Sequence, residues 1–311
     1  MKYYLAPLEG ITSYVYRNAY HKHFRPMDKY FTPFIVTSPN KKFSTRELKE
    51  LSQEHNKGLY VVPQLMSNQA DDFIKTAKAI AELGYEEMNL NLGCPSGTVV
   101  AKKKGSGFLA YPEELDTFLE QIYESLSLKI SIKTRIGKES PEEFYRLLEI
   151  YNKYPIEELI IHPRVQTDFY RNTVNLEMFE EAIQHSKNPL CYNGDIFTAE
   201  DFQKFSKAFP TVDKVMCGRG IIANPALISE IDEKELLTKE KLRAFHDDIY
   251  EEYKRISSGD RNTLFKMKEL WFYISQSFEG IEKPLKKIRK SEKCKDYDAV
   301  VQMIFDTCPL K

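Results

Sequence analysis

Eight short apolar runs recur along the first two thirds of the sequence, separated by a few tens of residues. They lie at residues 2–6, 30–36, 59–65, 87–91, 129–134, 158–162, 189–193 and 213–217. Segments with helical periodicity separate most of them, for example 71–83, 112–126 and 142–154. Strands that alternate with helices form parallel sheets, and eight repeats favour a closed barrel over an open doubly wound sheet. We therefore predict an α/β fold, a (β/α)8 TIM barrel.

The pattern changes near residue 235, after which helical segments follow one another without strands. These segments lie at 236–257, 262–278, 283–289 and 296–305, and Ser258, Gly259 and Asp260 form a turn signal between the first two. We expect a C-terminal all-α helical bundle. The predicted domains are a barrel at 1–234 and a helical domain at 235–311.

Composition excludes the disordered and fibrous classes, because 42% hydrophobic and 29% charged residues are ordinary for a globular protein. The sequence shows no signal peptide and no run of roughly 20 apolar residues, so we expect a cytoplasmic protein without a membrane partner. Its five cysteines are widely spread and form no CxxC pair. We expect free thiols and no metal site.

Charge is distributed unevenly along the chain. The net charge of −1 would argue against nucleic-acid binding if the charges were evenly spread. Residues 281–295, however, hold seven basic residues against two acidic ones. This segment is a local cationic patch that includes Lys286, Lys287 and Arg289.

Glycine-containing signatures follow the seventh and eighth runs. They are Asn193, Gly194 and Asp195 after the seventh, and Gly218, Arg219 and Gly220 after the eighth. TIM barrels commonly bind phosphate at these two loops, and glycine lets the backbone approach a ligand closely. We favour a phosphate site, although the glycines could also serve tight turns alone.

A lysine within a barrel strand needs an anionic partner. Lys133 lies in the fifth run, where apolar side chains would be usual, and His162 ends the sixth. A reduced flavin carries negative charge that both could stabilise, and Gln64 could bond a flavin edge. A structural salt bridge for Lys133 and an ordinary strand-end histidine are the alternatives.

The segment around Cys94 is the most informative part of the sequence. Asn91 would present its amide at the end of the fourth strand, while Gly93 and Pro95 would form a turn that displays the thiol. A buried, inert thiol is the usual alternative. The basic loop that follows, with Lys103 and Lys104, would lie at the barrel entrance or form a solvated loop.

Six motifs together resemble the tRNA-dihydrouridine synthase family. They are AlaProLeuGluGly at 6–10, AsnLeuGlyCysPro at 91–95, LysThrArg at 133–135, HisProArg at 162–164, AsnGlyAsp at 193–195 and GlyArgGly at 218–220. Their order and spacing match the family over residues 1–230, and the helical tail is similar more weakly. Leu8, Pro163, Val165 and the 102–107 loop depart from the family's usual residues, but the reactive groups stay in place.

The resemblance implies a bound FMN, with NADPH or NADH as reductant and tRNA as partner of a monomeric enzyme. The implied FMN-binding residues are Pro7, Leu8, Glu9, Gln64, Lys133, His162, Asn193, Gly194, Asp195, Gly218 and Arg219. Cys94 matches the family's proton donor, and Asn91 and Arg164 match positions near the uracil. The helical tail matches the domain that grips tRNA, and we assign Lys103, Lys104, Lys286, Lys287 and Arg289 to RNA contacts.

The implied reaction reduces the C5=C6 bond of a uridine in tRNA, with a hydride at C6 and a proton at C5. A thiol with an ordinary pKa of about 8.5 is protonated at neutral pH and can supply that proton. Two alternatives stay open. One is an FMN-dependent barrel oxidoreductase that acts on a free pyrimidine or small enone, and the other is a non-catalytic RNA-binding protein.

Overall fold

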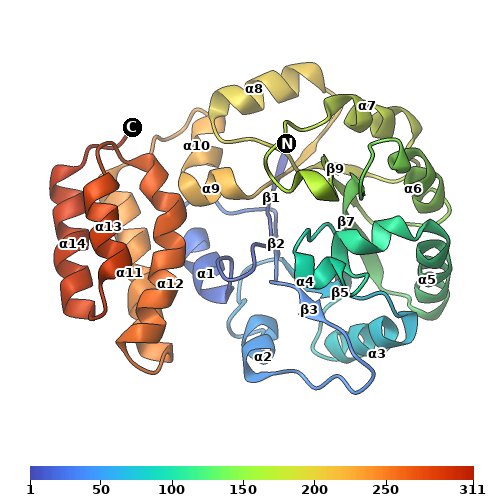
Figure 1. Ribbon diagram of the computed structural model, residues 1–311, viewed down its shortest axis with the longest axis horizontal. Coiled ribbons are helices and arrows are strands. Elements are labelled where there is room, and N and C mark those ends of the chain that lie inside the picture. The colour runs from blue at the N-terminus through green and yellow to red at the C-terminus, as the bar shows by residue number, and fades with distance from the viewer. The chain divides into compact units, whose positions relative to one another are not determined.

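Ten parallel strands form one sheet in the computed structural model, which describes residues 1–311 (Figure 1). Their order is β3-β5-β6-β7-β8-β9-β10-β1-β2-β4. The strands are β1 (Lys2–Leu5), β2 (Lys29–Phe31), β3 (Ile35–Val36), β4 (Val61–Val62), β5 (Gln64–Met66), β6 (Glu87–Leu92), β7 (Lys129–Gly137), β8 (Leu159–Val165), β9 (Leu190–Tyr192) and β10 (Lys214–Cys217).

Two prolines explain why ten strands occupy eight positions. Pro33 lies between β2 and β3, and Pro63 separates β4 from β5. Proline has no N–H to donate to the ladder, so each strand is interrupted there. β4 pairs with β2, while β5 pairs with both β3 and β6, so the sheet closes on itself. The predicted (β/α)8 barrel and all eight strand positions are confirmed.

The barrel interior is polar along alternate positions of its strands. Glu87 on β6 shares an ion-pair cluster with Lys29 on β2 and Glu158 beside β8, which are not neighbouring strands. Such contacts require these side chains to point into the barrel. Because successive strand residues face opposite sides, Asn89 and Asn91 point inward as well.

Clustering of contacts divides the chain into two units. The barrel unit contains Met1–Pro7, Asp28–Asp195 and Pro210–Met216, and the helical unit contains Leu8–Met27, Ile196–Phe209 and Cys217–Lys311. The helical unit thus takes in segments on both sides of residue 235. Functional domains at 1–234 and 235–311 remain a prediction.

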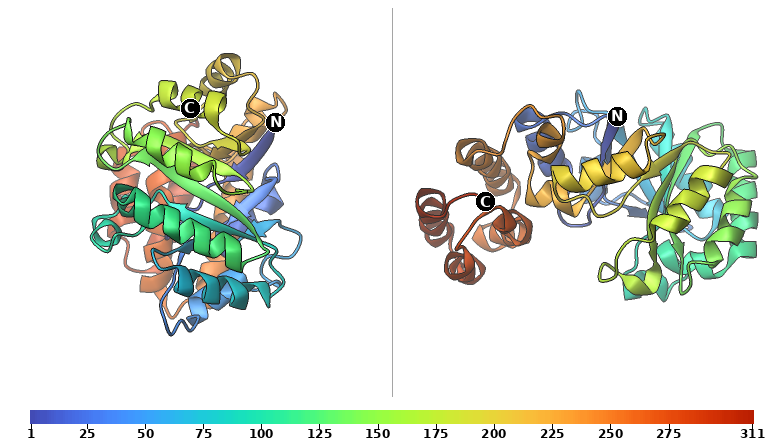
Figure 2. Two further views of the ribbon diagram at one scale, coloured as in Figure 1. Left: turned by 90° about the vertical axis from the view of Figure 1, so that its right-hand side faces the viewer. Right: turned by 90° about the horizontal axis from the view of Figure 1, so that it is seen from above.

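Helices cover the outside of the sheet in the barrel unit (Figures 1 and 2). They are α2 (Thr45–Leu51), α3 (Ala70–Ala81), α5 (Pro112–Ser125), α6 (Glu143–Tyr151) and α7 (Leu176–His185), while the short α4 (Gly97–Val100) follows the turn after β6 and lies inside this ring of helices in Figure 1. α3, α5 and α6 match the three helices predicted from periodicity. α5 begins with Pro112, whose fixed φ suits the first helical position. Their buried faces are apolar, as in Phe144 and Leu147 of α6.

The helical unit is built around a buried aromatic cluster. Its helices are α1 (Tyr14–His23), α8 (Ala199–Ala208), α9 (Arg219–Ala223), α10 (Leu227–Ile231), α11 (Lys239–Ile256), α12 (Asp260–Ile274), α13 (Glu282–Lys290) and α14 (Cys294–Thr307). The Trp271 indole donates to the Tyr297 hydroxyl at 2.7 Å, and His246 Nε2 lies 2.6 Å from the same oxygen. Gly259 has φ +80° and ends the turn between α11 and α12, as the sequence predicted. No helix is long and apolar enough to cross a bilayer.

Candidate active site at the carboxyl ends of the strands

A chain of amide hydrogen bonds crosses the barrel unit toward Cys94. Asn89 Nδ2 donates to Ser131 Oγ at 3.0 Å, and Gln64 Nε2 donates to Asn89 Oδ1 at 2.8 Å. Asn91 Nδ2 in turn donates to Gln64 Oε1 at 2.7 Å. Buried polar groups are costly unless paired, so this chain fixes the orientation of every amide in it.

The Asn91 carboxamide also fixes the turn that carries Cys94. Its Oδ1 accepts the backbone N–H groups of Gly93 and Cys94, both at 3.0 Å. The Cys94 carbonyl accepts from Ser106, through the backbone N–H at 3.1 Å and the hydroxyl at 2.8 Å. Asn91 is therefore a positioning residue for Cys94.

Cys94 is partly exposed rather than packed inside the barrel. Gly105 has φ +56°, and a Cβ there would lie 2.8 Å from the Cys94 carbonyl oxygen. Only glycine suits both the backbone conformation and this close approach. The basic loop is thus not simply solvated, because residues Gly105–Ala110 form a largely buried 3-10 helix against the Cys94 turn.

Lys133 lies next to that turn, and its ammonium has no anionic partner. An atom placed at the Cβ position of Gly93 would be 3.9 Å from Lys133 Nζ. Lys133 makes no ion pair, and the structural salt bridge considered from the sequence is absent. Burial, reinforced by the nearby Arg135 guanidinium, lowers the pKa of Lys133 to about 8. A partly buried cation without a carboxylate partner suits an anionic ligand.

His162, Arg164 and Asp195 form a hydrogen-bonded group. Arg164 pairs with the Asp195 carboxylate through both terminal nitrogens, and its Nη1 also lies 3.0 Å from His162 Nε2. A guanidinium can only donate, so the His162 Nε2 accepts and the ring proton resides on Nδ1. Arg164 Nε donates to the Asn172 carbonyl at 2.6 Å. Arg164 is buried, and four of its five N–H donors are engaged by protein groups.

Arg135 is a positioning residue that the sequence did not single out. It donates to the carbonyls of Gly93 at 3.0 Å, Val165 at 2.8 Å and Phe169 at 2.7 Å. It thereby joins the loops that follow β6 and β8. The LysThrArg motif contained this residue, but only its contacts reveal the role.

Tyr170 was also missed from the sequence. Its ring is half exposed, stacks on His162 with centroids 5.9 Å apart, and lies 5.3 Å from the Arg135 guanidinium. The preceding residue, Phe169, has a strained φ of 51°. No strand or helix periodicity marks this loop, so only the exposed pair of aromatic residues could have drawn attention to it.

The glycine loops after β9 and β10 are held by close packing. A Cβ on Gly194 would lie 1.9 Å from the Tyr192 hydroxyl, and Asn193 Nδ2 donates to the Met216 carbonyl at 2.8 Å. In the helical unit, a Cβ on Gly220 would lie 2.1 Å from the Ile196 carbonyl oxygen. Tight packing thus accounts for both glycines, whatever they bind. The Arg219 guanidinium lies 5.2 Å from the Phe197 ring centroid.

The barrel unit therefore holds two hydrogen-bonded groups, one of Gln64, Asn91 and Cys94 and one of His162, Arg164 and Asp195, with Lys133 beside the Cys94 turn. Pro7 follows β1 in the same unit, whereas Leu8, Glu9, Gly218 and Arg219 belong to the helical unit. Lys104 donates to the Thr37 carbonyl at 3.2 Å, and Lys103 lies 3.9 Å from the Tyr111 ring centroid. Lys286, Lys287 and Arg289 are exposed on α13 and form no ion pair.

A comparison with known protein families identifies the family to which this chain belongs. The family model described as "Dihydrouridine synthase (Dus)" matches residues 4–302. The chain belongs to the dihydrouridine synthase family. This bears out the resemblance that the six motifs indicated.

Other dihydrouridine synthase sequences match over most of the chain. A "Probable tRNA-dihydrouridine synthase 2" of Bacillus subtilis is 30% identical over 262 residues, covering 81% of this chain and 78% of that protein. A "tRNA-dihydrouridine synthase B" of Pasteurella multocida is 26% identical and covers 72% and 67%, respectively.

Solved structures share the fold of this dihydrouridine synthase family member. Morphinone reductase in complex with tetrahydroNAD has a TM-score of 0.51 at 13% identity, over 78% of this chain and 90% of that one. An old yellow enzyme homologue from Zymomonas mobilis has a TM-score of 0.53 at 12% identity, over 78% and 92%. At such low identity the likeness extends to the fold alone.

Proposed function

We propose that this protein reduces specific uridines of tRNA to 5,6-dihydrouridine, with FMN as prosthetic group and NADPH as reductant. Its family membership and the names of its relatives support the reaction class and the substrate. One observation carries the assignment to residues: the unpartnered ammonium of Lys133 lies beside the turn that holds Cys94, at the carboxyl ends of the barrel strands.

The residues at this end of the barrel fit a flavin. Lys133 offers a cation to the negative charge that a reduced flavin carries, and His162 offers an Nδ1 donor. The other proposed cofactor-binding residues are Pro7, Leu8, Glu9, Gln64, Asn193, Gly194, Asp195, Gly218 and Arg219. When bound, FMN would supply the hydride that is added to C6 of the base.

Cys94 would supply the proton in this reaction. Its thiol donates a proton to C5 of the uracil, and the resulting thiolate regains one from water, so the thiol is restored after each turnover. Asn91 and Ser106 hold the backbone on both sides of the sulfur through their bonds to the Cys94 N–H and carbonyl. Protein groups engage four of the five N–H donors of Arg164, so we propose that it holds His162 and Asp195 in addition to any contact with the base.

The helical tail is the proposed tRNA-binding part. Lys286, Lys287 and Arg289 are exposed and free of carboxylate partners, so they remain available to phosphates. A target base must leave its stack in folded RNA, which costs a few kcal/mol that phosphate contacts can offset. We propose residues 235–311 as the domain that supplies them, in a cytoplasmic monomer.

A thiol exchange tests the proposal. Cys94→Ala should retain FMN and NADPH oxidation but lose about two to four orders of magnitude in uridine reduction, as expected for loss of a general acid. Cys294→Ala removes the other partly exposed thiol and should behave as wild type. The measurement is the gain of two mass units in unmodified tRNA transcripts by mass spectrometry.

Three outcomes would contradict the proposal. Normal dihydrouridine formation by Cys94→Ala would refute the acid assignment. Equal or faster reduction of a free pyrimidine or small enone would favour the small-molecule oxidoreductase. A colourless purified protein that binds tRNA without oxidising NADPH would favour a non-catalytic RNA-binding protein.

A further inference from the structure

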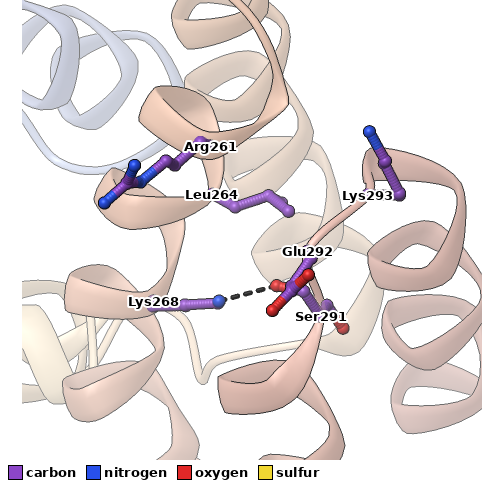
Figure 3. A pocket seen from close by; sticks show the side chains of 6 residues that line it. All are labelled: Arg261, Leu264, Lys268, Ser291, Glu292 and Lys293. Carbon is purple, nitrogen blue, oxygen red and sulfur yellow. Dashed lines mark hydrogen bonds between the residues drawn. The ribbon is translucent and has the colours of Figure 1, made fainter.

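A pocket of about 470 Å³ lies within the helical unit, between α12 and the segment that joins α13 to α14. It is lined by Arg261, Leu264, Lys268, Ser291, Glu292 and Lys293. Figure 3 shows Leu264 and Lys268 on α12 pointing toward the 291–293 segment, whereas the Arg261 guanidinium points to the other side of the helix. Three cations against one carboxylate give the lining a positive charge.

The cations of this pocket are mostly unoccupied by protein groups. Arg261 and Lys293 are exposed and make no ion pair or side-chain hydrogen bond. Lys268 donates one bond, to the Ser291 carbonyl at 2.6 Å, which holds its ammonium at the pocket (Figure 3). An ammonium has three donors, so two remain for a ligand. This arrangement suits a phosphate group.

Two aromatic rings lie on the same face of α12. Phe265 and Phe272 are 59% and 60% exposed, and both rings are therefore open to solvent. With Arg261 and Lys268 they occupy positions i, i+4, i+7 and i+11, so the four form one stripe along the helix. The Lys266 ammonium lies 5.3 Å from the Phe265 centroid and leaves the ring exposed.

Alternating cations and exposed rings match the chemistry of unpaired nucleic acid. Phosphates bind cations, while bases stack on aromatic rings regardless of sequence. We infer that the α12 stripe, Arg261, Phe265, Lys268 and Phe272, binds an unpaired segment of tRNA, with a backbone phosphate in the Lys268 pocket and a base stacked on a ring. This inference rests on the proposed function, because it takes tRNA as the substrate.

The stripe also differs from the basic patch identified in the sequence. That patch has seven basic and two acidic residues but no aromatic ring, and charged groups alone read the backbone of any RNA. The rings add a requirement for unstacked bases. The α12 stripe would therefore favour loops of tRNA over its paired stems.

Two double variants test the stripe by binding of an unmodified tRNA transcript, measured by fluorescence anisotropy across a salt series. Phe265→Leu with Phe272→Leu keeps apolar side chains but removes the rings, and should weaken binding about ten- to a hundredfold with an unchanged salt slope. Arg261→Gln with Lys268→Gln should reduce the magnitude of the salt slope by about one to two.

Matched control variants remove the same kinds of side chain, exposed charges and an exposed ring, from other helices. Lys204→Gln with Lys207→Gln removes two exposed charges from α8, and Tyr145→Leu removes an exposed ring from α6. Each should bind tRNA within about twofold of wild type, since surface changes away from a contact have small effects. A single-stranded oligouridine should compete with tRNA for wild type and compete less well for the ring variant.

The outcomes separate this inference from the proposed function. If wild type binds tRNA and forms dihydrouridine while the stripe variants match it, the inference is wrong and the function stands. If the ring variant changes oligomeric state and leaves RNA affinity intact, the stripe is a protein contact instead. If wild type binds no tRNA, the result contradicts the proposed function, and with it the inference that depends on it. Unchanged FMN content and thermal midpoint show that the variants fold.

Discussion

The two ends of the barrel interior each contain a lysine, and the two lysines differ in whether a carboxylate pairs with the ammonium. At the amino ends of the strands, Lys29 lies 2.9 Å from both Glu87 and Glu158. Burial would lower the pKa of Lys29, but the two carboxylates outweigh it and raise that pKa. At the carboxyl ends, Lys133 has no carboxylate, and burial lowers its pKa to about 8. A lysine paired with carboxylates stabilises the fold, whereas a lysine without such a partner can bind an anionic ligand.

Removing a carboxylate from the ion-pair cluster around Lys29 should have the largest effect on stability. Glu158 also accepts the Tyr4 hydroxyl at 2.6 Å and lies 3.6 Å from Lys214 Nζ. Glu158→Leu leaves two buried ammonium groups with one carboxylate fewer, so we expect a loss of about 3–5 kcal/mol in the free energy of unfolding. Urea denaturation would measure it. Glu200→Leu, which breaks the exposed pair with Lys204, should change stability by less than about 1 kcal/mol.

Removing the unpaired lysine should have the opposite sign. Lys133→Met relieves the burial of an uncompensated charge, so the FMN-free protein should be more stable at pH 7 by on the order of 2 kcal/mol. The same variant should lose most of its FMN during purification. A destabilised Lys133→Met apoprotein, compared with wild-type apoprotein by urea denaturation, would contradict the comparison between the two ends.

The amide chain at the mouth should contribute less. Asn91→Ala leaves the Gly93 and Cys94 N–H groups without their acceptor, at a cost of about 1–3 kcal/mol. Asn91→Asp keeps the acceptor but loses the donor to Gln64. We therefore expect the Asp variant to form dihydrouridine faster than the Ala variant in tRNA assays. Equal rates would show that the Cys94 turn does not depend on this side chain.

A pH dependence sharpens the same comparison, because the stability advantage of Lys133→Met should change gradually with pH. A lysine with a folded-state pKa near 8 binds fewer protons than the unfolded chain up to its usual pKa of about 10.4. Stability therefore rises with pH through that window. The advantage of Lys133→Met over wild type should be full below pH 8 and shrink toward zero by about pH 10.4. An advantage that stays constant over this range would assign the effect to packing.

Local patterns predicted most of the secondary structure correctly. Alternating apolar runs and helical segments placed all eight strand positions, since both periodicities are written in neighbouring residues. The predicted tail helices overlap α11, α12, α13 and α14. The interruptions at Pro33 and Pro63 were not predicted, because residues 30–36 and 59–65 were each expected to form one strand.

The candidate site could be predicted only in part. Cys94, Lys133 and His162 were found because unusual residues stood at strand ends. Arg135 was not, because its three carbonyl partners lie 30 or more residues away. Tyr170 lies in a loop with no periodic signal.

The sequence by itself determined the order of strands and helices, the turns between them and the family motifs, because each depends on residues close together in the chain. Only the tertiary structure decided which buried charges are paired. Lys29 meets Glu87 and Glu158 from 58 and 129 residues away, while Lys133 meets no carboxylate. Electrostatic energy depends on distance through space, and closure of the barrel sets that distance.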